Sequence, residues 1–165
     1  MDFNCLHPTI VFQEVPQEIS LCFSITGCRV GCKGCHSTEL WDPKQGEPLS
    51  NQRFTHWIER YQGLISCVLF FGGEWQPKTL IEKLHIAKSY GLKTCLYSGE
   101  QHVDMAISSQ LDFLKTGRWV PELGGLDSPR SNQVFRDMHT LEKLNHLFIT
   151  SPSHTSIAGA DNVAA

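Results

Sequence analysis

Three cysteines in one short loop are the residues of this sequence best suited to chemistry. Cys28, Cys32 and Cys35 have the spacing C-x3-C-x2-C, and the chain offers no fourth thiolate partner nearby. Thiolates bind zinc and iron–sulfur clusters, and a complete set of four protein ligands closes such a site. Three thiolates on a four-iron cluster leave one iron free to bind another molecule. The spacing therefore predicts an iron–sulfur cluster with one open position.

A zinc site made of these cysteines and His36 is the alternative interpretation of the loop. Cys35 and His36 are adjacent, which is an awkward arrangement for two ligands of one tetrahedral ion. Structural zinc sites usually take their ligands from two separated pairs, and the chain has no second C-x2-C and no H-x3-H. The ligand count favours the cluster, and a zinc-binding interaction module without catalysis is the competing hypothesis.

Other residues bear on the thiol chemistry. Arg29 and Lys33 flank the loop cysteines, and their positive charge is expected to lower the pKa values of the thiols. Cys22, Cys67 and Cys95 lie instead in apolar, strand-like runs, where cysteine usually acts as a small buried hydrophobe. We therefore expect only the loop cysteines to bind metal.

The segments around the loop alternate between strands and helices, which is typical of an α/β fold with a parallel sheet. We expect strands at residues 10–15, 19–26, 65–71, 93–97, 111–114 and 146–150. Helices are expected after the N-cap candidate Ser50 and from Pro77, with weaker ones at residues 103–108 and 141–144. A long loop is expected at residues 117–133, and a disordered tail at residues 151–165.

Two motifs directly follow predicted strands. The first is the cysteine loop, and the second is Gly72-Gly73-Glu74. In parallel α/β folds ligands gather at the carboxyl ends of the strands, because the loops there surround a common mouth. Three glycines of the cysteine loop can adopt the positive φ angles that bring the backbone close to a bulky ligand. They are Gly27, Gly31 and Gly34.

The composition is that of an ordinary globular chain, with one domain expected over residues 1–150. The 165 residues are 41% hydrophobic, and the formal charge of -3 gives little electrostatic support for binding nucleic acid. No apolar run approaches the roughly 20 residues of a membrane helix, and the first residues lack the pattern of a signal peptide. We therefore expect a cytoplasmic protein with neither nucleic acid nor membrane as a partner.

The cysteine loop after one strand and Gly-Gly-Glu after the next resemble the radical S-adenosylmethionine enzymes. Further segments narrow the resemblance to the activases of anaerobic ribonucleoside-triphosphate reductase, namely residues 14–16, 35–41, 114–119, 125–129 and 131–133. The similarity spans about residues 8 to 150. It implies an incomplete parallel (β/α) barrel of about five or six strands, as a single radical S-adenosylmethionine domain.

The resemblance also implies an activity. The three loop cysteines would hold a [4Fe-4S] cluster whose open iron binds the amino and carboxylate groups of S-adenosylmethionine. One electron from the cluster then cleaves this cofactor, and the resulting radical removes hydrogen from a glycine of the large reductase subunit. The chain has no extra ferredoxin-like cysteine segment, so an external flavodoxin or ferredoxin is expected to supply the electron. Another glycyl-radical enzyme or a small molecule is the alternative target.

The same resemblance assigns contacts with S-adenosylmethionine to Gly34, His36, Gly72, Gly73, Glu74 and Ser98. Gly34 and His36 flank the third cysteine, where related enzymes lay backbone against the adenine. The two glycines of the second motif would approach the methionyl ammonium, with Glu74 as its charge partner, and Ser98 would bind ribose or carboxylate oxygens. Two positions depart from the common pattern. Gly34 replaces an aromatic residue, and Trp75 replaces a proline.

Overall fold

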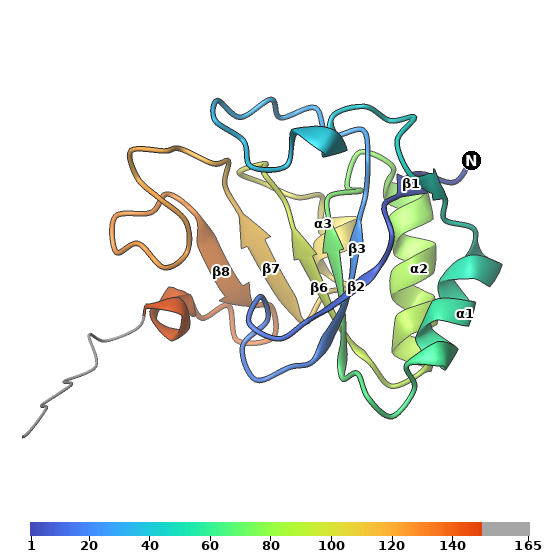
Figure 1. Cartoon of the computed structure of the whole chain (residues 1–165). Helices are drawn as coiled ribbons and strands as arrows, with labels where there is room; N and C mark the ends of the chain where they lie inside the picture. The colour runs from blue at the N-terminus through green and yellow to red at the C-terminus, as the bar shows by residue number, and fades with distance from the viewer. Residues whose placement is uncertain (150–165) are drawn as a thin grey trace, which may run out of the picture.

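A computed structural model describes residues 1–149, so the tail predicted at 151–165 lies outside the described residues. The molecule is built on a six-stranded sheet with the order β2-β3-β5-β6-β7-β8 (Figure 1). These strands are Thr9–Val11, Ser20–Ser24, Cys67–Phe71, Lys93–Tyr97, Phe113–Thr116 and Val134–Asp137. The four inner strands are parallel, and β2 and β8 pair antiparallel at the two edges. The predicted α/β class is confirmed, with a mixed sheet.

The remaining elements lie around this sheet. Two short strands, β1 (Asn4–Cys5) and β4 (Glu47–Pro48), form a separate antiparallel pair. The α-helices are α1 (Asn51–Arg60), α2 (Pro77–Ser89) and α3 (Met105–Ser108), and the 3-10 helices are η1 (Thr38–Leu40) and η2 (Asn145–Phe148). Figure 1 shows α1 and α2 together on one side of the sheet. No helix within residues 1–149 has the length and apolar character needed to cross a membrane.

The two longer helices begin where the sequence predicts. The hydroxyl of Ser50 accepts a hydrogen bond from the amide of Arg53 at 3.1 Å, which caps α1. Pro77 occupies the first turn of α2, where its missing N–H costs nothing. Beyond α2, Gly91 has a φ of 73°, and the amide of Leu92 returns to a carbonyl of the last helical turn. Local sequence signals therefore fix these helix boundaries.

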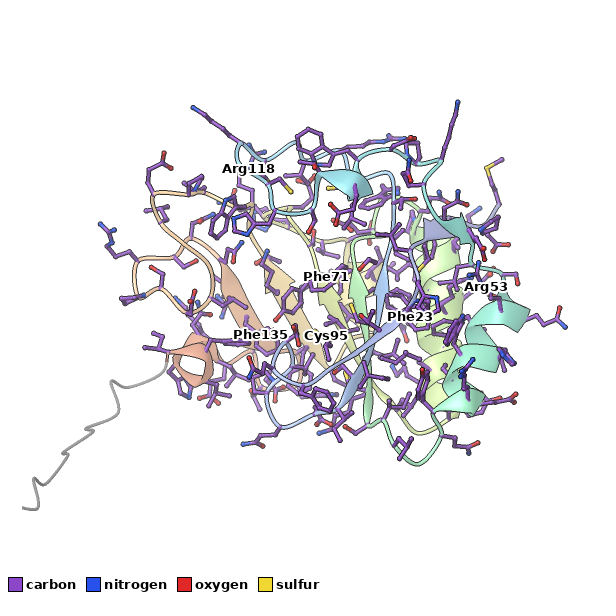
Figure 2. All side chains as sticks on the ribbon, viewed as in Figure 1. Phe23, Arg53, Phe71, Cys95, Arg118 and Phe135 are labelled. Atoms are coloured by element: carbon purple, nitrogen blue, oxygen red, sulfur yellow. The ribbon has the colours of Figure 1, made fainter. Side chains whose placement is uncertain are left out.

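Alternate residues of the strands enter two different cores. On the helix side Phe23 packs against Phe54 of α1, with their ring centroids 4.9 Å apart. On the other face Cys95 and Phe135 are fully buried (Figure 2). Cys22 and Cys67 belong to this second core as well, so the prediction that these thiols are buried hydrophobes is confirmed.

Coil, and not a long helix, covers the second face of the sheet. Val15, from the turn between β2 and β3, and Leu126, from the long loop between β7 and β8, are both buried there. The short helix η2 adds Phe148, whose ring lies 5.0 Å from that of Phe135. The predicted loop at residues 117–133 is confirmed, since it contains no helix or strand. It closes one side of the core.

The last part of the described chain differs from the prediction. The sequence predicts a strand at residues 146–150, but η2 occupies most of this range, and the sheet ends in β8, which the pattern does not reveal. Asn145 explains the difference. Its side chain accepts a hydrogen bond from the amide of Phe135 at 2.9 Å and donates one to the carbonyl of Gln133 at 2.8 Å. These bonds occupy backbone groups beside β8 and hold the following residues in a tight turn.

The helix predicted at residues 141–144 is also absent from the described structure. Leu141 has a φ of 61°, in the left-handed region that a right-handed helix excludes. The guanidinium of Arg136 donates to the carbonyl of Leu141 at 3.0 Å. This segment is therefore a return loop from β8 to η2.

Candidate iron–sulfur site

One cavity at the carboxyl ends of the parallel strands contains all three loop cysteines in its wall. Its volume is about 260 Å³. Six of the residues proposed from the sequence line it, namely Cys28, Cys32, Cys35, Gly72, Glu74 and Ser98. Gly34, His36 and Gly73 do not line it. The structure thus brings the cysteine loop and the Gly-Gly-Glu turn to one place, as the strand order predicts.

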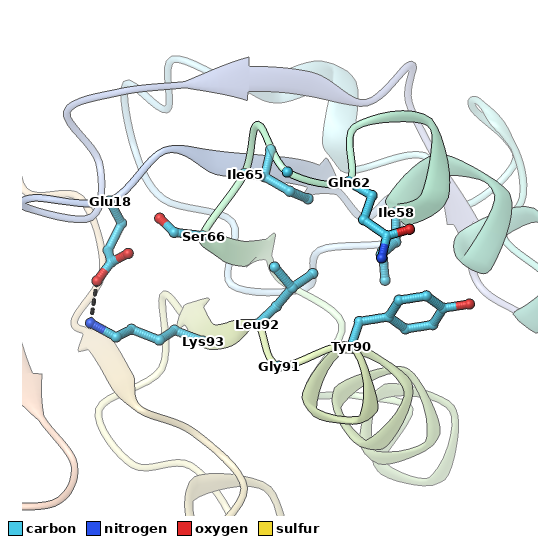
Figure 3. Close-up of a pocket in the computed structure, with 10 residues that line it drawn as sticks. Glu18, Ile58, Gln62, Ile65, Ser66, Tyr90, Gly91, Leu92 and Lys93 are labelled. Carbon is cyan, nitrogen blue, oxygen red and sulfur yellow. Dashed lines mark hydrogen bonds and ion pairs between the residues drawn. The ribbon is translucent and has the colours of Figure 1, made fainter.

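A larger cavity of about 460 Å³ lies at the opposite, amino ends of the same strands (Figure 3). Its walls include the apolar side chains of Ile58, Ile65 and Leu92, and Lys93 forms an ion pair with Glu18 on one side. Among residues 1–149, no cysteine and no histidine lines this cavity. Because thiolate and imidazole are the preferred ligands of iron–sulfur clusters and zinc, the smaller cavity is the candidate metal site.

Backbone hydrogen bonds and glycines shape the cysteine loop. The amides of Gly27 and Cys28 both donate to the carbonyl of Leu40, at 2.7 and 2.9 Å, and this closes the loop at its base. Positive φ angles are found at the three predicted glycines, with 96° at Gly27, 62° at Gly31 and 69° at Gly34. The amide of Ser37 lies 3.4 Å from the sulfur of Cys35. An amide directed at a thiolate stabilises its negative charge.

The donor set fits a cluster better than a single ion. Within residues 1–149 no group of three or more Cys, His, Asp or Glu side chains is placed to hold one metal ion. The thiolates of a four-iron cluster bind different iron atoms, so their sulfurs surround a volume and do not converge on a point. Cys28, Cys32 and Cys35 satisfy this requirement, since all three line one cavity.

Burial controls the protonation of the first cysteine. It raises the pKa of the Cys28 thiol, and the negative charge of Glu74 acts in the same direction. Arg29 and Lys33 are exposed to solvent, and the predicted lowering of the thiol pKa is wrong for Cys28. The thiolate that a metal requires is therefore disfavoured at Cys28 when no metal is bound.

The Gly-Gly-Glu turn directs a carboxylate toward the cavity. Gly72 and Gly73 have φ angles of 77° and 108°, so both use the left-handed region that favours glycine. Ser98 donates a hydrogen bond of 2.5 Å to one carboxylate oxygen of Glu74, and its own oxygen accepts from the amide of Glu100 at 3.0 Å. The other oxygen of Glu74 is buried and has no hydrogen-bond partner among residues 1–149. Burial raises the pKa of this carboxyl group.

Trp75 connects the two motifs. A Cβ atom added to Gly72 would lie 2.6 Å from the Trp75 ring, and one added to Gly27 would lie 3.4 Å from the indole nitrogen. The indole therefore occupies space that side chains at these two glycines would need. Trp75 also lines the cavity. The residue that departs from the common pattern thus joins the turn to the cysteine loop.

Sequence reasoning misses Lys115 as a residue of the site. This lysine of β7 is 9% exposed and lines the cavity. Its ammonium donates to the carbonyl of Gly117 at 2.8 Å and to that of Ser98 at 3.4 Å. Burial lowers its pKa to about 8. The available signal is a lysine just after the predicted strand at residues 111–114, at the strand end where ligands gather. Trp119 and Gln133 of the long loop also line the cavity.

Lys115 is expected to make the stability of the protein rise with pH. Its pKa is about 8 in the folded protein and 10.5 without burial, so the unfolded chain binds more protons between these values. The free energy of unfolding then increases across this window. Relative to Lys115→Met, we expect the wild type to gain on the order of 2 kcal/mol. Denaturant unfolding of both cluster-free proteins at the two pH limits measures this gain, and a constant difference between them would contradict it.

Comparison with known families agrees with this geometry. A family model described as a 4Fe-4S single cluster domain matches residues 19–123. The matched span includes the cysteine loop, the Gly-Gly-Glu turn and Lys115, and the match supports binding of a 4Fe-4S cluster. No curated protein matches the chain. Because the matched residues make up more than half of its length, this chain belongs to the 4Fe-4S single cluster domain family.

Proposed function

We propose that this protein is a radical S-adenosylmethionine activase. It cleaves S-adenosylmethionine reductively at a [4Fe-4S] cluster and removes hydrogen from a glycine of anaerobic ribonucleoside-triphosphate reductase, leaving a glycyl radical on the large subunit. The observation that carries the proposal is the single cavity that is lined by three thiols, the buried ammonium of Lys115 and the half-buried carboxylate of Glu74. The family match supports the cluster, and the segments at residues 114–119 and 131–133 support the target.

The charges in the cavity complement the head group of an amino acid. Within residues 1–149, Glu74 presents a buried oxygen without a hydrogen-bond partner, and the Lys115 ammonium donates to two carbonyl oxygens and lies over the Tyr97 ring. A zwitterionic amino acid carries one ammonium and one carboxylate, which match these two side chains. Ion pairs between these side chains and the bound amino acid would also offset the free energy needed to remove the charges of Glu74 and Lys115 from water. We therefore assign the methionyl ammonium to Glu74 and the methionyl carboxylate to Lys115.

The chain contributes ligands, orientation and exclusion of water. Cys28, Cys32 and Cys35 would hold the cluster. When bound, the cluster and S-adenosylmethionine supply a carbon radical able to remove hydrogen from a C–H bond. Phe71 and Tyr97 line the cavity beside Trp75, and such aromatic walls keep water from a reactive species.

The sheet supports an open barrel for this activity. In the described strand order β2 and β8 are at opposite edges and do not pair with each other. We propose that the sheet is the incomplete barrel of a radical S-adenosylmethionine domain covering residues 1–150. An open side suits a substrate glycine presented on a loop of a large protein. The loop at residues 117–133 adjoins the cavity through Trp119 and Gln133, which favours it as the contact with the reductase.

An external flavodoxin or ferredoxin is the proposed electron donor. Arg29 and Lys33 are exposed on the cysteine loop, and Arg118 extends into solvent at the same end of the molecule (Figure 2). Positive side chains around a cluster favour an encounter with an acidic carrier protein. The donor is therefore expected to approach this end, in the cytoplasm where such carriers occur.

Electron paramagnetic resonance tests the proposal directly. The protein is reconstituted anaerobically with iron and sulfide, reduced, and measured with and without S-adenosylmethionine. We expect a reduced cluster signal that changes when S-adenosylmethionine is added, because the cofactor would bind the open iron. Addition of the large reductase subunit should then produce a glycyl doublet.

Each alternative has its own outcome in this experiment. A cluster signal that ignores S-adenosylmethionine would contradict the proposal. Cleavage of S-adenosylmethionine without a glycyl doublet would favour another glycyl-radical enzyme or a small molecule as the target. Stoichiometric zinc in place of iron would favour the interaction module.

A further inference from the structure

Trp119 lies against the cysteine loop although it comes from the distant loop after β7. Its indole nitrogen is 3.8 Å from the position that a Cβ atom of Gly34 would occupy, and its ring centroid is 4.7 Å from that of His36. It lines the same cavity as the three cysteines. An aromatic ring from another segment therefore stands beside the third cysteine, where the loop itself has only glycine.

The indole nitrogen of Trp119 is a buried donor without an acceptor among residues 1–149. An indole N–H can only donate, and a buried donor that lacks an acceptor destabilises the protein. The lining of the cavity by Trp119 places this group where a bound molecule can reach it. The site therefore favours a ligand with an acceptor and a flat face.

Residue 34 of the cysteine loop cannot carry an aromatic side chain into the space that Trp119 occupies beside Cys35. A Cβ atom there would lie 3.3 Å from the ring of Pro121, and the φ of 69° disfavours any side chain. Trp119 and Pro121 thus occupy the space next to Gly34. The long loop supplies the aromatic surface that the cysteine loop lacks.

We propose that Trp119 binds the purine base of the nucleoside ligand of this site. Its ring stacks on the base, and its indole N–H, which points along the plane of the ring, donates to a ribose oxygen of the same nucleoside. A purine nucleoside offers a π face on its base and oxygen acceptors on its ribose, which match the two features of the indole. The inference rests on the proposed function, in which the ligand is the adenine nucleoside S-adenosylmethionine.

Binding measurements on the cluster-loaded protein test this assignment. Equilibrium dialysis gives the dissociation constants of S-adenosylmethionine and of methionine, which shares the head group but has no base. We expect Trp119→Ala to weaken S-adenosylmethionine binding about tenfold or more through lost stacking. Trp119→Phe keeps an aromatic face and should lose about threefold to tenfold, because only the hydrogen bond is removed. Methionine binding should not change in either variant.

Trp41→Phe is the matched control, since Trp41 is 42% exposed and does not line the cavity. It should bind both ligands as the wild type does. Unchanged S-adenosylmethionine binding in the Trp119 variants would overturn the inference, as would an equal loss of methionine, which would indicate a merely structural role. Trp119→Phe keeps the test valid if Trp119→Ala does not fold. A wild-type protein that loads the cluster but binds no S-adenosylmethionine would instead overturn the proposed function.

Discussion

Replacement of Cys32 with Ala is expected to abolish assembly of the iron–sulfur cluster. Cys32 is the most buried of the three loop cysteines, at 9% exposure, and its carbonyl accepts a hydrogen bond from the amide of Cys35 at 3.2 Å. The variant has only two loop thiolates, so two of the four iron atoms would lack a protein ligand. Two protein ligands are too few to retain a cluster that needs three. Iron and sulfide content after anaerobic reconstitution should fall to background, together with the visible absorbance and the S-adenosylmethionine-dependent signal.

Cys22→Ala is the matched control for this change. Cys22 lies in β3, only a few residues before the loop, and is buried in the core of the second face. Its replacement removes one thiol without altering the loop, so the cluster content should equal that of the wild type. Full cluster content in Cys32→Ala, or an equal loss in both variants, would contradict the assignment of the loop cysteines as ligands.

Glu74→Gln is expected to separate cofactor binding from cluster binding. The amide keeps an oxygen that accepts from Ser98, but it removes the charge that we propose pairs with the methionyl ammonium. A charge-assisted hydrogen bond contributes about 1.5 to 3 kcal/mol, so the affinity for S-adenosylmethionine should fall about tenfold to more than a hundredfold. Equilibrium dialysis measures the affinity, and iron content should equal that of the wild type because the three thiols are untouched.

Glu100→Gln provides the control for Glu74. Glu100 is an exposed neighbouring carboxylate that does not line the cysteine cavity, although its amide binds Ser98. Its neutralisation changes the local charge by the same amount and should leave the affinity nearly unchanged. Equal losses in both variants would show a general electrostatic effect, and no loss in Glu74→Gln would remove Glu74 from the site.

Most of the fold can be predicted from local patterns, and the exceptions have a common cause. The buried run that forms β5 and the capped helix α1 contain their own signals in consecutive residues. β8 does not, because Phe135 is its only fully buried residue and Arg136 next to it is exposed. The apolar run at residues 147–149, preceded by His146, has the pattern of a strand. Its conformation depends on the side-chain bonds of Asn145 to a neighbouring segment, which no local pattern reveals.

The site also combines features that consecutive residues predict with features that depend on tertiary contacts. The cysteine spacing and the Gly-Gly-Glu turn are local, so their meeting at one sheet edge follows from the order of the strands. Lys115 and Trp119 reach the cavity only because β7 lies beside β6 and the long loop folds back over the cysteine loop. From the sequence alone, a lysine after an apolar run is expected at the surface. The structure buries Lys115 because the carbonyl oxygens of Ser98 and Gly117 accept hydrogen bonds from its ammonium. Tertiary placement, and not residue type, makes these two residues part of the site.

The division of each strand between two cores has a consequence for how this protein can evolve. In β5, Val68 and Phe70 face the helices, whereas Leu69 and Phe71 face the coil-covered side that leads to the cavity. A change at Phe71 would reshape the cavity, whereas Val68 and Phe70 would keep their packing against the helices. Alternate residues of one strand therefore separate the wall of the cavity from the packing that stabilises the fold.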